Sequence, residues 1–365
     1  MFLNGKKSRM QVFKQSVGVD ISKSDFVAYF EVMLSNQRIK KIGRRKFDNT
    51  PSGAKRFVQW LVKKSVKDVL LEVVMEATGR YHEVLAYHLY EGHYRVCIVL
   101  PNRIKYFARS LNQFSKTDPI DAAVIARYGL SQPLEAWEPP REGMRRLREL
   151  SRERQDLVKM KTQAINRLHA MRSSAKLANS TIERLELQLA FFEQQIAVVE
   201  AEMNQLSNQD QHLAYQVKQL TSIPNIGTTS AYTILAETAG FQLFSNRNQL
   251  IKYAGLDVVE NQSGTSIEGR SRISKRGNAN LRAALYMPAV SALTKPSVFR
   301  DTYQRHLDSH KNKSKALMAV QRKLLLVAFG THQSGQMYDE QQHRCRTSKQ
   351  VGEHKGSPTV AHLVN

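Results

Sequence analysis

The sequence predicts an α/β fold with a mixed sheet, followed by a mainly helical remainder. Between residues 15 and 135, short runs rich in β-branched and aromatic residues alternate with amphipathic helical patterns. Between residues 140 and 212 the helical pattern is continuous, and after residue 216 it is broken by turns and strongly basic. At roughly 100 to 200 residues per domain, a chain of 365 residues has room for two or three domains.

The first region opens with three strand-like runs that follow one another without an intervening helix. This succession predicts an antiparallel meander at one side of the sheet, and the alternation after it predicts a mixed sheet. The expected elements are strands at Val17–Ile21, Phe26–Met33 and Gln37–Phe47, an amphipathic helix at Ser52–Lys64, a strand at Val69–Met75, a helix from about Arg80 to Glu91, a strand at Tyr94–Leu100 ended by Pro101, and a helix opened by Asp118.

The second region, residues 140–212, has no proline after Pro140 and one glycine, Gly143. Its second half carries apolar residues at alternating spacings of three and four, which is a coiled-coil seam. The polar stretch Ser173–Ser180 is a suitable turn, so we expect a helical hairpin. The alternative is a helix pair that lies on the protein's own core. The seam consists of Leu185, Leu189, Phe192, Ile196, Val199, Met203 and Leu206.

The third region, residues 216–330, begins with two helical patterns around the turn Pro224–Gly227. This arrangement resembles a helix-hairpin-helix motif with Asn225 where glycine is common, and we expect residues 228–230 to cap the second helix. Its backbone N–H groups would then suit a DNA phosphate, whereas the alternative is an ordinary turn in a core. We expect Gly277 to end a basic turn before a helix from about Asn278. Residues 1–14 and 331–365 are expected to be tails without fixed structure.

The charge predicts a polyanionic partner, because 55 Lys and Arg face 32 Asp and Glu, for a net charge of +23. From Ser266 to Gly330, 13 basic residues face three acids. No apolar run approaches the roughly 18 residues of a membrane span, and no signal peptide is evident. Cys97 and Cys345 lie far apart and lack the spacing of a zinc site, and two cysteines poorly support a disulfide framework, so we expect a reducing, cytoplasmic compartment. We expect no membrane partner.

Four carboxylates in the first region end strands or open a helix. Asp20 and Glu76 end predicted strands, and Asp118 and Asp121 lie three apart on one helix face. Carboxylates that converge in this way favour hard cations, Mg²⁺ or Mn²⁺. Structural interpretations also exist, since Asp118 before Pro119 suits an N-cap and Asp20 suits a strand-end turn. The segment GVDIS also resembles a phosphate loop of actin-like ATPases, although no second glycine-rich loop accompanies it.

In the third region, Ser263-Gly264 lies in what we expect to be a polar, flexible loop, with Ser266 as a nearby competitor. A serine hydroxyl needs a base or charge stabilisation to act as a nucleophile. Cations follow it closely in the sequence, but no base is evident. From spacing alone, a loop serine is rarely a nucleophile.

The segments VGVDIS, MEATGRY and KTDPIDA resemble the RuvC-like domain of the DEDD insertion-sequence transposases, family one-ten, which includes Piv-type DNA invertases. The resemblance spans residues 15–330 and implies a ribonuclease H-like sheet. It also implies that Asp20, Glu76, Asp118 and Asp121 are the catalytic metal-binding tetrad and that Ser263 is the catalytic nucleophile.

The function we expect is that of a DNA transposase that cuts and rejoins donor and target DNA. The resemblance implies guidance by a bridge RNA and assembly as a dimer or tetramer through the helical hairpin. The alternatives are a Piv-type invertase, a metal-dependent nuclease without a covalent intermediate, and a non-enzymatic chromatin-like protein. The enzyme would associate with the bacterial nucleoid when bound to DNA. The expected nucleic-acid-binding residues are Lys116, Ile226, Gly227, Thr228, Arg270, Arg272, Lys275, Arg276 and Arg282.

Overall fold

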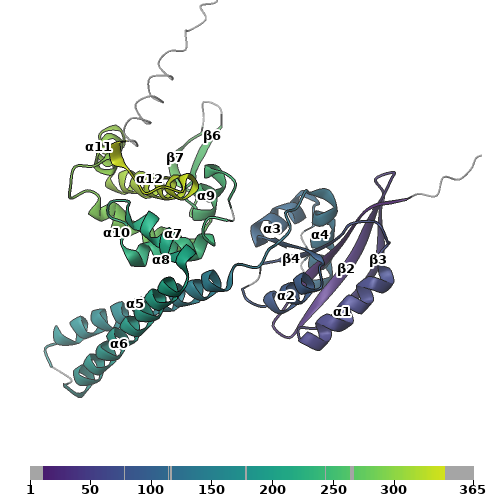
Figure 1. Ribbon diagram of the computed structural model, residues 1–365, viewed down its shortest axis with the longest axis horizontal. Coiled ribbons are helices and arrows are strands. Elements are labelled where there is room, and N and C mark those ends of the chain that lie inside the picture. The colour runs from purple at the N-terminus through teal and green to yellow at the C-terminus, as the bar shows by residue number, and fades with distance from the viewer. Residues whose placement is uncertain are drawn as a thin grey trace, which may run out of the picture. The chain divides into compact units, whose positions relative to one another are not determined.

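The structure is a computed structural model that describes residues 11–341 apart from residues 78, 114, 116, 177–178, 243 and 264–266. It describes no side chain from residue 260 to residue 271. The chain forms two compact units that meet in sequence between Pro139 and Pro140, and each unit is described by itself (Figure 1).

The first unit is built on a five-stranded sheet in the order β3-β2-β1-β4-β5. Strands β1, β2 and β3 form an antiparallel meander, and β4 and β5 run parallel to β1. This confirms the expected mixed sheet with an antiparallel meander at one side. The strands are β1 (Val12–Ile21), β2 (Asp25–Leu34), β3 (Ile39–Asp48), β4 (Leu71–Glu76) and β5 (Arg95–Val99).

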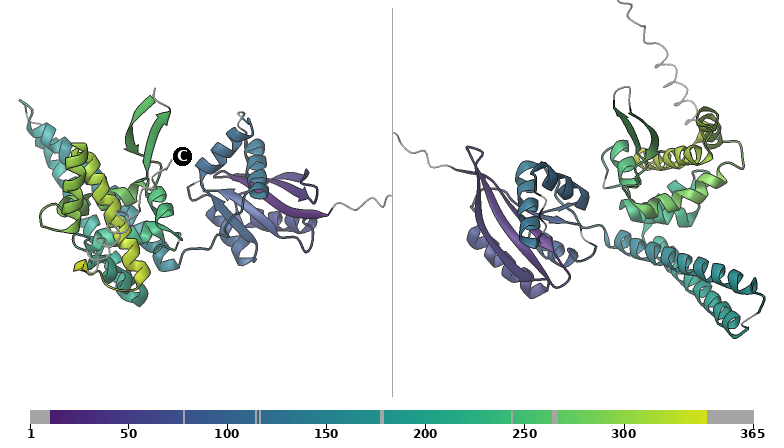
Figure 2. Two further views of the ribbon diagram at one scale, coloured as in Figure 1. Left: turned by 90° about the horizontal axis from the view of Figure 1, so that it is seen from above. Right: turned by 180° about the vertical axis from the view of Figure 1, so that it is seen from behind.

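Helices cover both faces of this sheet (Figures 1 and 2). On one face, α1 (Pro51–Lys64) packs its aromatic residues against Phe26 and Phe47, and α2 (Glu83–Glu91) adds to the same core. On the other face lie α3 (Pro101–Ser110) and α4 (Asp118–Ser131). Helix α3 was not expected, because we interpreted Pro101 only as the end of a strand, whereas proline is also favoured in the first helical turn.

The second unit begins with the expected helical hairpin of α5 (Glu142–Arg172) and α6 (Asn179–Gln209). Four residues of the predicted seam, Leu185, Phe192, Val199 and Met203, are buried, which confirms its spacing. The base of the hairpin also packs into the core of the helices that follow, through Leu147 and Leu150 among others. The base of the hairpin therefore lies on the protein's own core, as the second interpretation expected.

The remaining elements of the second unit are mainly helical and share one core. They are α7 (Gln211–Thr221), α8 (Thr228–Thr238), α9 (Arg247–Ala254), β6 (Val258–Ser263), β7 (Ile267–Ile273), α10 (Ala279–Ser291), α11 (Val298–His310) and α12 (Lys313–Ser334). No helix in the described part of the chain is long and apolar enough to cross a membrane.

Both expected tails are shorter than predicted. Strand β1 already begins at Val12, which pairs with Leu34. At the other end, α12 continues to Ser334, and the backbone N–H of Tyr338 donates to the Ser222 hydroxyl at 2.8 Å. Residues 1–10 and 342–365 lie outside the described residues.

Candidate functional site

Asp20 and Glu76 lie side by side at the carboxyl ends of two neighbouring parallel strands. Val19 of β1 pairs with Met75 of β4, and each acid follows directly. Side chains alternate along a strand, so Asp20 lies on the same face as Gly18, and Glu76 on the same face as Val74. Both Gly18 and Val74 face α4. The two acids therefore belong to the sheet face that α4 covers.

Helix α4 brings its first turn to the same edge of the sheet. A Cβ atom on Gly18 would overlap the Ala122 carbonyl oxygen and the Ala126 nitrogen, so the absence of a side chain permits this close approach. Further along α4, a Cβ on Gly129 would meet Ser16, which precedes Gly18 on β1. The helix thus runs opposite to β1 and starts near the carboxyl end of that strand. Asp121, next to Ala122, lies on this first turn.

The N-cap of α4 differs from the expectation by one residue. The helix begins at Asp118 itself, and Thr117 is the N-cap, although its side chain makes no capping hydrogen bond. Asp118 is therefore not the capping residue that the structural interpretation required. Asp118 and Asp121 are the acids of the first turn, where the positive end of the helix dipole favours negative charge.

The donor chemistry of this edge fits a hard divalent cation, because all four candidates are carboxylates. Their side chains are not gathered into a closed site, however. Within residues 11–341, leaving out the gaps given above, no three Asp, Glu, His or Cys side chains lie close enough together to hold a metal ion. The backbone thus brings the four acids to one edge without gathering any three of their side chains around a common point.

The candidate nucleophile Ser263 is the last residue of β6, where it pairs with Ile267 of β7. The expectation of an irregular loop is wrong for the residues around it, because β6 and β7 form an antiparallel hairpin. The side chain of Ser263 is not among those described, and Gly264 and Ser266 lie outside the described residues. Strands went unnoticed because the segment VVENQS lacks alternation between apolar and polar residues.

A basic turn joins this hairpin to α10. Arg272, Lys275 and Arg276 are exposed, and Lys275 adopts a positive φ of 52°. A Cβ on Gly277 would overlap the Tyr253 carbonyl oxygen, so the turn packs tightly against the end of α9. Three basic side chains are thus presented on a firmly held backbone. Of the other predicted residues, Arg270 has no described side chain and Lys116 lies outside the described residues.

Arg282 and Ile226 have partners within the protein. The guanidinium of Arg282 donates to the Ala254 carbonyl at 2.8 Å. The Ile226 side chain is buried in the core, and its N–H donates to the Ile223 carbonyl. Ile226 therefore anchors the turn, and neither its side chain nor its N–H is available to nucleic acid.

The turn between α7 and α8 otherwise resembles the expected motif. Asn225 adopts a positive φ of 72°, as the missing glycine required. The N-cap of α8 is Gly227 and not a residue from 228 to 230. Because glycine has no side chain, this N-cap has no side-chain capping hydrogen bond. Gly227 and Thr228 are exposed, and a Cβ on Gly227 would meet nothing within 4 Å. This leaves open space at the start of α8.

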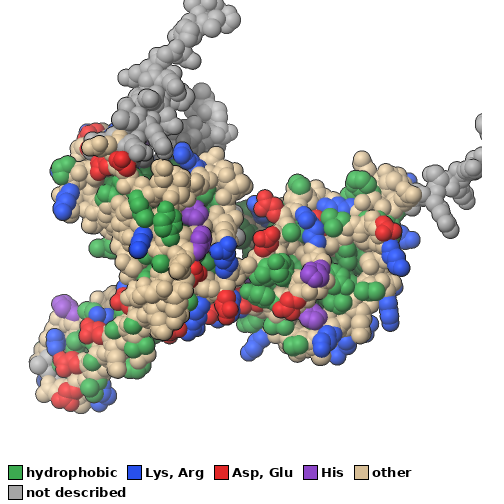
Figure 3. All heavy atoms as spheres, in the orientation of Figure 1, with side chains coloured by type: hydrophobic (Ala, Val, Ile, Leu, Met, Phe, Trp, Pro, Cys, Tyr) green, Lys and Arg blue, Asp and Glu red, His purple; other side chains and the backbone are tan. Residues whose placement is uncertain are grey.

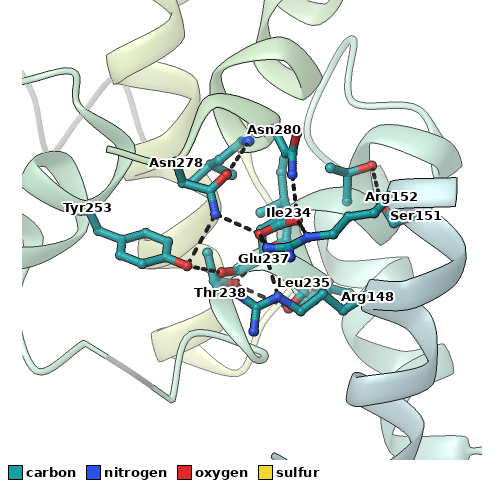
Figure 4. Close-up of polar contacts among 12 residues, drawn as sticks. Arg148, Ser151, Arg152, Ile234, Leu235, Glu237, Thr238, Tyr253, Asn278 and Asn280 are labelled. Atoms are coloured by element: carbon teal, nitrogen blue, oxygen red, sulfur yellow. Dashed lines mark hydrogen bonds and ion pairs between the residues drawn. The ribbon is translucent and has the colours of Figure 1, made fainter. Parts of the chain in front are cut away.

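A buried carboxylate behind the basic turn was missed from the sequence. Glu237 is fully buried and accepts two hydrogen bonds from Arg152, at 2.7 and 2.9 Å (Figure 4). Asn278, the N-cap of α10, donates to it at 2.6 Å, and Asn280 donates at 3.1 Å. Arg148 adds an ion pair at 3.6 Å. Glu237 therefore joins the base of the helical hairpin to the start of α10.

The pKa of Glu237 reflects this environment. Burial opposes ionisation, but hydrogen bonds from Arg152 and Asn278, with the charges of Arg152 and Arg148, outweigh it and hold the pKa below its usual value. The sequence signal was a single acid within the apolar run AYTILAETAG. Such an acid is buried only when it is paired.

Comparisons with known proteins match most of the chain. A family model for DEDD transposases of the IS110 type, described as "Transposase", matches residues 17–174. A second, described as "Transposase IS116/IS110/IS902 family", matches residues 217–304. The pilin gene-inverting proteins of Moraxella lacunata and Moraxella bovis are each 28% identical over 331 residues, which cover 90% of this chain and 99% of theirs.

Other similarities are more partial. An uncharacterized 43.6 kDa protein of the insertion element IS110 from Streptomyces coelicolor is 29% identical over 33% of this chain and 29% of its own. Among solved structures, T. thermophilus RuvC in complex with Holliday junction substrate has a TM-score of 0.26 at 10% identity and covers 34% of this chain and 99% of that chain. The fowlpox virus Holliday junction resolvase has a TM-score of 0.23 at 16% identity, covering 32% and 96%.

Proposed function

Because this chain belongs to the IS116/IS110/IS902 family of transposases, we propose that it cuts and rejoins the DNA strands at the ends of an insertion sequence. The observation that carries this proposal is the assembly of four acids at one sheet edge. The register of β1 with β4 and the approach of α4 at Gly18 bring Asp20, Glu76 and the first turn of α4 to that edge.

In this proposal the tetrad of Asp20, Glu76, Asp118 and Asp121 holds Mg²⁺ or Mn²⁺. The bound cation would supply charge neutralisation at the phosphodiester. The four acids themselves would hold that cation at the carboxyl end of the sheet. Glycine at position 18 lets α4 approach closely enough for Asp121 to take part.

Ser263 is the proposed nucleophile. Its Oγ forms a bond to phosphorus and loses its proton, while the bond from phosphorus to one sugar oxygen breaks and that oxygen leaves as a hydroxyl. The resulting serine phosphodiester conserves the bond energy needed to join another strand. Arg272, Lys275 and Arg276, exposed on a firmly held turn after the same hairpin, would stabilise the charged phosphate.

We further propose that a structured bridge RNA guides the enzyme to donor and target DNA. The family resemblance implies this partner, and a net charge of +23 leaves room for two nucleic acids.

Assembly through the helical hairpin is part of the same proposal. Leu187, Phe191 and Val198 are 72%, 53% and 54% exposed on α6, and their helical spacing places them on one side of that helix. The seam toward α5 is formed by other residues, so this apolar stripe is available to a second copy of the chain.

The second candidate is a DNA invertase. It is favoured by the similarity to two pilin gene-inverting proteins, which extends over 99% of their length and 90% of this chain. It would use the same acids and serine but invert a resident DNA segment. To distinguish the two, a single protein preparation is given one plasmid that carries the ends of a mobile element and another that carries an invertible segment, and the products are sequenced. Strand joining at the element ends supports the transposase, and inversion of the segment supports the invertase.

The tetrad is tested by measuring strand cleavage of element-end DNA with and without Mg²⁺. Asp20→Asn and Asp121→Asn should each lower the rate by about 100-fold or more, since a catalytic metal supplies several kcal/mol. Asp68→Asn is the matched control, because Asp68 lies outside the cluster at a positive φ of 64° that asparagine tolerates. Cleavage that persists in folded Asp20→Asn, or that needs no divalent cation, would contradict the proposal.

A further inference from the structure

Strand β3, at the edge of the first sheet, is strongly basic. Five of its ten residues are Lys or Arg, and all five are exposed. Figure 3 shows Lys and Arg side chains along the border of the first unit where both β3 and α1 lie in Figure 1. The five residues are Lys40, Lys41, Arg44, Arg45 and Lys46.

The strand register places some of these residues on the face of the catalytic acids. Residues directly opposite each other in a sheet point to the same face. Gly18 pairs with Tyr29, and Tyr29 pairs with Arg44, so this row lies on the face that α4 covers at β1. In the next row, Asp20 pairs with Val27, which pairs with Lys46.

Lys41 belongs to the same face. It pairs with Glu31, whose carboxylate accepts two hydrogen bonds from Arg127 of α4. Its ammonium lies 4.9 Å from the centre of the Tyr29 ring. Helix α4 packs on β1, β2 and β4, which leaves the β3 side of this face to solvent.

The charges on this side are only partly neutralised within the protein. Lys46 forms an ion pair with Asp25 at 3.1 Å, and the carboxylate of Glu31 forms an ion pair with Arg127. Lys41 and Arg44 form no ion pair with any residue that the structure describes. Both lie two strands from Asp20, and Arg44 is two rows and Lys41 four rows along the sheet from it. The backbone distances are therefore about 12 Å for Arg44 and about 17 Å for Lys41.

We propose that Lys41 and Arg44, with the ring of Tyr29 beside them, bind backbone phosphates of the DNA strand whose phosphodiester lies at the Asp20 edge. This rests on the proposed function, since it extends the path of the DNA away from the four acids. Spans of about 12 and 17 Å correspond to roughly four and five nucleotides of duplex rise, so one continuous strand reaches the acids and both basic residues.

A basic edge strand has another explanation, because lysines on an edge prevent strands of two molecules from pairing. That role does not depend on which face carries the charge. Lys40 pairs with Val32 of the opposite core, and Arg45 lies over the Phe47 ring on that side. The two faces of β3 therefore provide a matched pair of variants.

The salt dependence of DNA binding separates the two explanations. Affinity of the full chain for a labelled 30-base-pair duplex is measured over a range of salt concentrations. K41Q/R44Q should lower the log–log slope by about 1.8, or about 0.9 for each lost phosphate contact. K40Q/R45Q removes the same charge from the same strand and should leave the slope unchanged. Equal slopes for both double variants would overturn the inference.

Cross-linking provides a readout that does not depend on charge or cleavage. A photoreactive benzoylphenylalanine at position 44 should cross-link the labelled DNA several-fold more than the same residue at position 45. The same cross-linking can be measured in chains that also carry Ser263→Ala, so the result does not depend on whether the DNA strands are cut. Equal labelling at both positions, or preferential labelling of an RNA of equal length, would overturn it.

Discussion

At Gly18, the absence of a Cβ atom lets α4 lie close to β1 at the edge that carries the four carboxylates. Any side chain there would push α4 away from β1, because the Ala122 carbonyl and the Ala126 nitrogen occupy the space of its Cβ. The sequence VGVDIS predicted the acid but not this requirement, since a glycine in a strand does not reveal which element approaches it.

Gly18→Ala should therefore destabilise the first unit by about 1–3 kcal/mol and lower strand cleavage further than the stability loss explains. Urea unfolding and the cleavage assay measure the two effects. Gly330→Ala is the control: its Cβ would meet nothing within 4 Å on α12, so it should be neutral or stabilising. Full activity of Gly18→Ala would contradict the role of α4 at the edge.

Glu237 is the second residue with a measurable role. Glu237→Gln removes one partner of a buried ion pair and should lower the free energy of unfolding by about 3–5 kcal/mol. Glu149→Gln, a control in a half-exposed pair with Arg145 at 3.6 Å, should cost less than about 1 kcal/mol. Similar losses for both variants would show that Glu237 does not hold the hairpin to α10.

The pH dependence of stability gives Glu237 a separate signature. A carboxyl group whose pKa is lowered in the folded protein stabilises the fold at pH values above its usual pKa of 4.5. This stabilisation is lost as the pH falls through the lower pKa of the folded state. Wild-type protein should thus lose stability below about pH 4.5 more steeply than Glu237→Gln. Denaturant unfolding between pH 3 and 6 measures this difference, and parallel curves would be contrary to it.

At the scale of elements, apolar periodicity predicted the amphipathic helices and strands and missed the elements without such a pattern. The meander, the helical hairpin and the turn at Asn225 follow from apolar spacing and turn chemistry. The β6–β7 hairpin carries Ser263 on a polar sequence, and α3 begins at a proline that also ends a strand. Strand β6 pairs with β7, and α3 packs on α4, and a local sequence pattern includes neither partner.

The outer stripe of α6 makes the hairpin's assembly role testable. Phe191→Glu should lower the mass measured by light scattering, because it places a charge within an apolar interface. Ala197→Glu lies six residues further on the same helix and about 120° around it from Phe191, is also exposed, and changes the charge equally. It should leave the mass unchanged. An unaltered mass in Phe191→Glu would argue against assembly through this stripe.

At the scale of the whole molecule, the charge was the first indication of a nucleic-acid partner, and the structure gives it two locations. Lys41 and Arg44 flank the acids in the first unit, and Arg272, Lys275 and Arg276 follow the serine hairpin in the second. The roles proposed for Asp20 and Ser263 come from the family resemblance, because a local pattern does not show which distant residues would act with them.

Guidance by RNA should be visible in the purified protein. A preparation made with nuclease inhibitors should contain one discrete RNA of defined length, detected by sequencing and by gel electrophoresis. A preparation that is active in strand transfer and contains no RNA would contradict this partner and favour the invertase.

The central claim is that one chain combines a metal-dependent cut with a serine-linked intermediate, and trapping that intermediate tests it most directly. Wild-type protein incubated with Mg²⁺ and end-labelled element DNA, then denatured, should yield a covalent protein–DNA adduct. Ser263→Ala should abolish the adduct and strand joining, whereas Ser266→Ala should retain both. Strand cleavage that survives in Ser263→Ala without an adduct would contradict the claim and leave a metal-dependent nuclease.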